Sequence, residues 1–138
     1  MAAKPNSILA LDLGEKRIGL ARASMAARLP EPLPLLGNDE NFVARLKALI
    51  EEYSVDTLVI GLPRNGSGQE TAQSSWARQF AESVLRPNFS GDIVFQDETL
   101  SSVAAESYDS SLIAKFGLDS LAALEIMKDY LENKNVTD

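Results

Sequence analysis

The chain opens with short apolar runs separated by turn residues, a pattern that is typical of β-strands. Apolar residues predict strands over residues 7–13 and 17–23, joined by a turn at Gly14, and a third strand near 28–36. The third segment carries three prolines, which confine it to a sheet edge because proline cannot donate to a strand ladder. Alternation in the first strand places two sets of side chains on opposite faces: Ile8, Ala10 and Asp12 on one, and Leu9, Leu11 and Leu13 on the other.

Beyond these strands the pattern changes to helices that alternate with strands. Apolar residues at helical spacing predict helices over residues 39–53, 70–85 and 119–132, and a further one from near Ser101 or Ser102. Asn38 is the predicted N-cap of the first helix. Short apolar runs predict strands at 58–60 and 93–95. Hairpins followed by strand–helix alternation indicate one α/β domain over residues 1–138, with helices on both faces of the sheet.

Composition limits the available chemistry. The 138 residues are 45% hydrophobic and 24% charged, as in an ordinary globular domain. They contain no apolar run of transmembrane length and no signal-peptide core, so we expect a cytoplasmic protein without a membrane partner. The absence of cysteine and histidine excludes disulfides, zinc–thiolate sites and imidazole catalysis. Any metal must be held by oxygen ligands, which favours Mg²⁺ or Mn²⁺.

The net charge of −7 is unevenly distributed along the chain. Residues 1–69 hold eight basic and eight acidic side chains, whereas residues 70–138 hold five basic and twelve acidic ones. This balance argues against nonspecific duplex binding, which needs a cationic surface. It leaves room for a local basic patch, for which Lys16, Arg17, Arg22 and Arg64 are the candidates.

Three acids occupy positions where the local pattern calls for an apolar or neutral residue: Asp12 in the first strand, Glu98 after the strand at 93–95, and Asp119 at the head of the last helix. Each alone has an ordinary structural explanation, such as a helix N-cap for Asp119. An α/β sheet could bring all three to one edge. Two carboxylates ~4 Å apart repel by roughly 4 kcal/mol at an effective dielectric of about 20, so such a cluster needs a cation. One or two Mg²⁺ ions would meet this need, and a pair of ions is the arrangement used for phosphodiester hydrolysis.

Four segments also resemble the motif blocks of a known family. They are Asp-Leu-Gly-Glu-Lys-Arg-Ile-Gly-Leu-Ala at 12–21, Val-Ile-Gly-Leu-Pro at 59–63 with the loop to residue 68, Asp-Glu-Thr-Leu-Ser-Ser-Val-Ala-Ala-Glu at 97–106, and Leu-Asp-Ser-Leu-Ala-Ala at 118–123. In this order they resemble the YqgF family, RNase H-like proteins described as Holliday junction resolvases and as pre-16S rRNA nucleases. The resemblance spans nearly the whole chain and implies an RNase H-like mixed sheet.

The resemblance also assigns roles to particular residues. It matches Asp12, Glu98 and Asp119 to the catalytic, metal-binding acids of the family and leaves the role of the neighbouring Asp97 open. Lys16, Arg17 and Arg64, which lie in loops beside these acids, are expected to bind nucleic acid. Asn65, in the glycine-containing loop after Pro63, is expected to join them. The chain departs from the family at Thr99, where an arginine is usual, and so lacks a cation suited to a scissile phosphate.

Two functions of different classes follow. The first is a metal-dependent endonuclease of structured nucleic acid that processes the 5′ end of pre-16S rRNA or resolves branched DNA. The second is a noncatalytic nucleic-acid-binding or ribosome-assembly factor, which Thr99 and the acidic second half favour. A nucleotide-binding domain of the actin and sugar-kinase type is disfavoured, because that fold needs two such domains. The sequence separates neither RNA from branched DNA nor a monomer from a homodimer.

Overall fold

A computed structural model describes residues 6–64, 67, 69–98 and 108–137, with side chains as far as residue 132. Its elements are β1 (Ser7–Leu13), β2 (Arg17–Ser24), β3 (Glu31–Gly37), α1 (Phe42–Tyr53), β4 (Val55–Pro63), α2 (Ala72–Phe80), β5 (Asp92–Glu98), α4 (Ser110–Phe116) and α5 (Leu118–Thr137). The strands form one sheet in the order β3-β2-β1-β4-β5. The pairs β1–β2 and β2–β3 are antiparallel, whereas β1–β4 and β4–β5 are parallel. The predicted mixed sheet is confirmed, and so is the edge position of the proline-containing strand.

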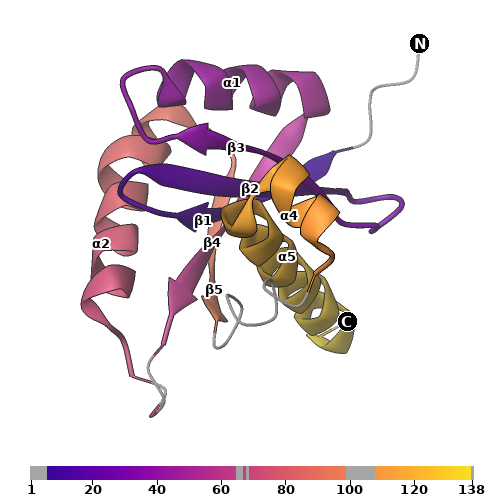
Figure 1. Cartoon of the computed structure of the whole chain (residues 1–138). Coiled ribbons are helices and arrows are strands. Elements are labelled where there is room, and N and C mark those ends of the chain that lie inside the picture. The colour runs from indigo at the N-terminus through magenta and orange to yellow at the C-terminus, as the bar shows by residue number, and fades with distance from the viewer. Residues whose placement is uncertain (1–5, 65–66, 68, 99–107, 138) are drawn as a thin grey trace.

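Helices cover both faces of this sheet (Figure 1). Leu9, Leu11 and Leu13 belong to the core that β1 forms with α1 and α2, while Ile8 and Ala10 belong to the core beneath α5. The alternation predicted for the first strand is therefore confirmed. It also places Asp12 on the face that α5 covers. No helix within the described ranges has the length and apolar character needed to span a bilayer.

Three predicted helices differ from the structure at their ends. Helix α1 begins at Phe42 with Asn41 as its N-cap, so the prediction that Asn38 caps it is wrong. The segment predicted as one helix over 70–85 is α-helical only to Phe80 and continues as a π-helical turn over Ala81–Leu85. The last helix begins at Leu118, which puts Asp119 in its first turn instead of at an N-cap.

Other predictions concern the stretch around the third acid. Strand β5 is longer than predicted and includes both Asp97 and Glu98. The helix predicted from near Ser101 or Ser102, like Thr99, lies outside the described residues. Helix α4 lies between that stretch and α5, in the region that the prediction left without a stated helix end.

Candidate active site

Asp12 lies near the end of β1, between two glycines on the neighbouring strands. Its partner on β2 is Gly19. On the other side, Leu11 pairs with Ile60 of β4, so the next residue, Gly61, lies alongside Asp12. Because both neighbours are glycines, neither adjacent strand places a side chain of its own beside the Asp12 carboxylate, and other segments of the chain occupy that space. The other two predicted acids enter the site over these glycines.

Gly19 lets the first turn of α5 lie directly against β2. A Cβ added at Gly19 would be 1.9 Å from the carbonyl oxygen of Asp119. The next residue of the helix, Ser120, is fully buried, and its hydroxyl accepts a hydrogen bond of 3.0 Å from the amide of Leu20. The register between β2 and β3 shifts between Ile18 and Leu20, at the same place. Backbone contact and hydrogen bond together fix Asp119 next to the strand pair that carries Asp12.

Gly61 makes room for the third acid in the same way. A Cβ added there would be 3.0 Å from Oε1 of Glu98 and 2.4 Å from Cδ1 of Ile126 on α5. Glu98 ends β5 and is only 7% exposed. Since β1, β4 and β5 are parallel, their carboxyl ends lie at one edge of the sheet. The Glu98 carboxylate thus lies over Gly61, on the α5 face where Asp12 also lies.

The charges of these acids act on one another. The pKa of Asp12 rises from its ordinary value of 3.8 to about 7, first because burial disfavours the carboxylate and then because Glu98 and Asp119 repel its charge. Among the described residues, none donates a hydrogen bond or forms an ion pair with the Asp12 carboxylate. A cation at this position would relieve all three unfavourable effects.

The donor set fits a hard divalent cation, because it consists of carboxylate oxygens alone. Within the part of the chain that the structure describes, however, no three such side chains already enclose an ion position. The Asp119 carboxylate is paired with Arg17, whose Nε is 3.1 Å from its Oδ2. Asp12, Glu98 and Asp119 are the residues that would hold Mg²⁺ or Mn²⁺, with Asp119 exchanging the guanidinium for the metal.

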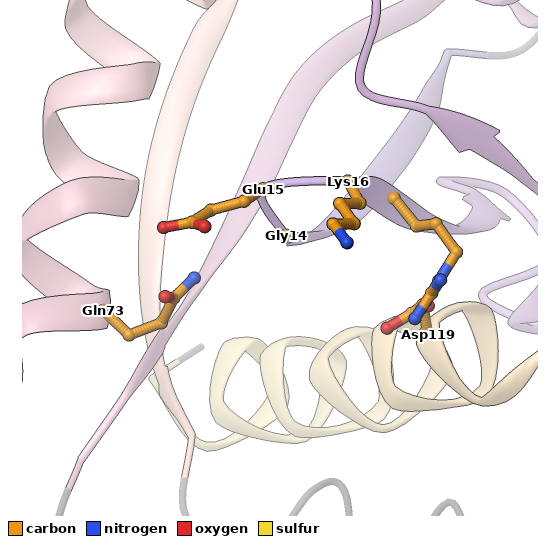
Figure 2. Close-up of a pocket in the computed structure, with 6 residues that line it drawn as sticks. Gly14, Glu15, Lys16, Gln73 and Asp119 are labelled. Atoms are coloured by element: carbon orange, nitrogen blue, oxygen red, sulfur yellow. The ribbon is translucent and has the colours of Figure 1, made fainter.

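A pocket of ≈ 410 Å³ adjoins the acids and is lined by Gly14, Glu15, Lys16, Arg17, Gln73 and Asp119. Figure 2 shows Glu15 and Lys16 on the β1–β2 turn, with Gln73 reaching in from α2 and Asp119 from α5. Gln73 was not expected from the sequence, where it is one more polar residue at an exposed helix position. Its Nε2 donates to the carbonyl oxygen of Leu13 at 3.1 Å, so it supports the end of β1.

Asn38 supports the same turn from the opposite side. Its Nδ2 donates to the carbonyl oxygen of Gly14 at 3.0 Å, and its backbone amide donates to that of Lys16 at 2.9 Å. This is the role it has in place of the predicted helix cap. The turn that carries Lys16 and Arg17 is thereby held between β3 and α2.

The predicted basic residues lie in different surroundings. Lys16 and Arg17 are exposed on the pocket. Arg64 instead places two nitrogens 3.0 and 2.7 Å from Oδ1 of Asp97 and is only 19% exposed. Asp97, whose role the sequence left open, is thus the partner of Arg64. Asn65 lies outside the described residues.

A mixed sheet of order β3-β2-β1-β4-β5, with acids at the ends of β1 and β5 and in the first turn of α5, places the protein in the RNase H-like class. Solved structures support this fold: a Thermus thermophilus RuvC in complex with a Holliday junction substrate has a TM-score of 0.56 at 11% identity, covering 95% of this chain and 97% of that one. The fowlpox virus Holliday junction resolvase has a TM-score of 0.50 at 13% identity, covering 93% and 99%.

The chain belongs to the RuvX (YqgF) family of nucleases, whose family model, described as "Holliday junction resolvase", matches residues 6–133. A relative from Roseiflexus is 35% identical over 97% of this chain and 99% of its own length. One from Geobacillus thermodenitrificans is 36% identical over 91% of this chain and 97% of its own. Both carry the name "Putative pre-16S rRNA nuclease". The resemblance found in the four motif blocks is confirmed.

Proposed function

We propose that this protein is a metal-dependent endonuclease that hydrolyses phosphodiester bonds in structured nucleic acid. The observation that carries the proposal is the placement of Asp12 between Gly19 and Gly61, with Asp119 and Glu98 entering over the two glycines. A structural role for the three acids would not require them to lie at the same end of the sheet. Burial first, and then repulsion by Glu98 and Asp119, raise the pKa of Asp12 to about 7, which is an unfavourable arrangement unless the site binds positive charge.

In this proposal Asp12, Glu98 and Asp119 hold Mg²⁺ or Mn²⁺ and are the catalytic acids. When bound, the metal supplies an activated water and a charge that stabilises the leaving oxygen. Buried Glu98 and half-buried Asp12 are held by the sheet, while the more exposed Asp119 adjusts. Lys16 and Arg17 bind phosphates of the substrate at the adjoining pocket. Arg64 and Asn65 would extend this contact along the loop after β4, with Arg64 first leaving Asp97.

The names of the relatives support a ribosomal RNA precursor as the substrate, cut at the 5′ end of pre-16S rRNA. Branched DNA is the second candidate, favoured by the description of the family. Both are structured nucleic acids that expose phosphates at bends and junctions. An acidic protein with one local basic turn suits recognition of such a feature better than nonspecific binding along a duplex.

The test is a cleavage assay of the purified chain on pre-16S rRNA, an unstructured single-stranded RNA and a four-way DNA junction, each with Mg²⁺, Mn²⁺ or a chelator. We expect metal-dependent cleavage of one structured substrate. Asp12→Asn and Glu98→Gln should lower its rate on the order of 100-fold or more, since each removes an ionised ligand. Glu15→Gln is the matched control, because Glu15 lines the same pocket outside the proposed ligand set. Binding without cleavage in every metal would instead indicate the noncatalytic factor.

A further inference from the structure

Arg17 and Asp119 form an ion pair at the pocket beside the acids. Nε of Arg17 lies 3.1 Å from Oδ2 of Asp119, and 62% of the arginine side chain is exposed against 34% of the aspartate. Arg17 is the first residue of β2, and Asp119 is in the first turn of α5. The pair thus joins the turn expected to bind nucleic acid to a carboxylate expected to bind metal.

The chemistry of the guanidinium allows it to exchange this partner. Arginine binds phosphate through the same forked geometry that it uses for carboxylates. An ion pair as exposed as this one changes the equilibrium constant for its own formation by only up to about five-fold. A competing charge is therefore able to displace it. A divalent cation on Asp119 would be such a competitor, because it would repel a guanidinium that lies 3.1 Å from the same carboxylate.

We propose that Arg17 is an exchangeable counter-ion that couples the two kinds of binding. Without metal it neutralises Asp119; when a divalent cation binds there, Arg17 is released to a phosphate of the nucleic acid. The inference rests on the proposed function, which makes Asp119 a metal ligand. Its consequence is that metal and nucleic acid raise one another's affinity through Arg17, by the same factor in both directions.

Lys16 provides a matched control. It precedes Arg17 in the same turn and lines the same pocket, but within the described residues it forms no ion pair with Asp119. Lys16→Gln and Arg17→Gln each remove one positive charge near the acids. Only Arg17→Gln also removes the competitor of the metal. A difference between the two variants therefore reports the ion pair, while an equal effect reports general electrostatics.

The first experiment titrates Mn²⁺ into the full chain without nucleic acid, at constant pH and ionic strength, and measures its dissociation constant by calorimetry. We expect Arg17→Gln to bind Mn²⁺ about two- to five-fold more tightly than the wild type, with a clearly smaller gain for Lys16→Gln. Equal gains in the two variants, or no gain for Arg17→Gln, would overturn the proposal. Asp119→Asn separates this from failure of the site: if it binds Mn²⁺ as tightly as the wild type, Asp119 is not a ligand and the proposed metal site is itself wrong.

The second experiment measures the coupling directly. Binding of a fluorescent four-way DNA junction is followed by anisotropy with and without Mn²⁺, and the junction is checked on a gel to be uncut. We expect the factor by which Mn²⁺ strengthens binding to fall about two- to five-fold in Arg17→Gln and to stay unchanged in Lys16→Gln. A coupling factor in Arg17→Gln equal to that of the wild type would contradict the exchange.

Discussion

The hydroxyl of Ser120 accepts a hydrogen bond from the amide of Leu20 at 3.0 Å, across 100 residues of sequence. It is the polar contact between the start of α5 and the centre of β2, at a point where the serine is fully buried. Next to it, the carbonyl of Asp119 lies over Gly19. The position of one proposed ligand therefore depends on a hydrogen bond and a glycine that carry no catalytic chemistry themselves.

Ser120→Ala should destabilise the protein by about 1–3 kcal/mol, because it leaves the buried amide of Leu20 without its acceptor. Urea unfolding measures the change. Ser83→Ala is the control, since Ser83 is exposed and bonds only the carbonyl of its own helical segment; we expect it to stay within about 0.5 kcal/mol of the wild type. Equal stability of Ser120→Ala and Ser83→Ala would show that α5 does not need this bond.

Gly19→Ala and Gly61→Ala should impair the protein in different ways, the first mainly in stability and the second mainly in metal binding. At Gly19 the new Cβ meets backbone atoms of Asp119 and Ser120, which cannot move without displacing α5, so we expect about 3 kcal/mol of destabilisation or more. At Gly61 it meets side-chain atoms of Ile126 and Glu98, which are buried but can shift by rotation about side-chain bonds without moving a helix backbone. We expect a smaller loss of stability there, together with weaker Mn²⁺ binding because the Glu98 carboxylate is displaced. Chemical denaturation and metal titration of both variants separate the two effects.

Much of the fold was predictable because it depends on local periodicity. Alternation in β1 assigned Ile8 and Ala10 to one face and Leu9 to the other, and proline assigned β3 to the edge. The three acids stood out because each interrupts an apolar pattern. These signals lie within a few residues of sequence, where the period of a strand or helix determines which side chains are buried.

What the sequence did not reveal depends on contacts between distant segments. The need for glycine at positions 19 and 61 arises from α5 and Glu98, which follow much later in the chain. The side chains of Gln73 and Asn38 each donate a hydrogen bond to a carbonyl group at the β1–β2 turn, and such bonds leave no pattern in composition or spacing. The pairing of Arg64 with Asp97 follows from the β4–β5 register, and it makes this arginine less available for nucleic acid than its loop position suggests.

The raised pKa of Asp12 predicts a pH dependence of stability. Because the folded pKa is about 7 and the ordinary value is 3.8, the folded state binds a proton that the unfolded state has lost between these values. This contribution therefore stabilises the fold at low pH and is lost as the pH rises toward 7.

Asp12→Asn, which cannot ionise, isolates the effect. With chelator present, the variant should gain stability relative to the wild type as the pH rises from about 4.5 to about 8, by on the order of 2 kcal/mol. Added Mn²⁺ at the higher pH should raise the melting temperature of the wild type more than that of Asp12→Asn, because only the carboxylate binds it well. If the variant is less stable than the wild type at every pH with chelator present, Asp12 is a structural hydrogen-bonding residue and no metal ligand.

The salt dependence of nucleic-acid binding should show which basic residues contact phosphates. Each phosphate contact that is lost lowers the slope of log K against log salt concentration by about 1. We expect this loss for Lys16→Gln and for Arg17→Gln in the presence of Mn²⁺, since both side chains are exposed on the pocket. Arg64→Gln should change the slope less, because Asp97 already pairs with the guanidinium and the side chain is only 19% exposed.

Lys47→Gln on α1, which covers the opposite face of the sheet from α5, is the control and should leave the slope unchanged. A slope reduced equally by Lys47→Gln and Lys16→Gln would mean that the nucleic acid does not bind at the β1–β2 turn.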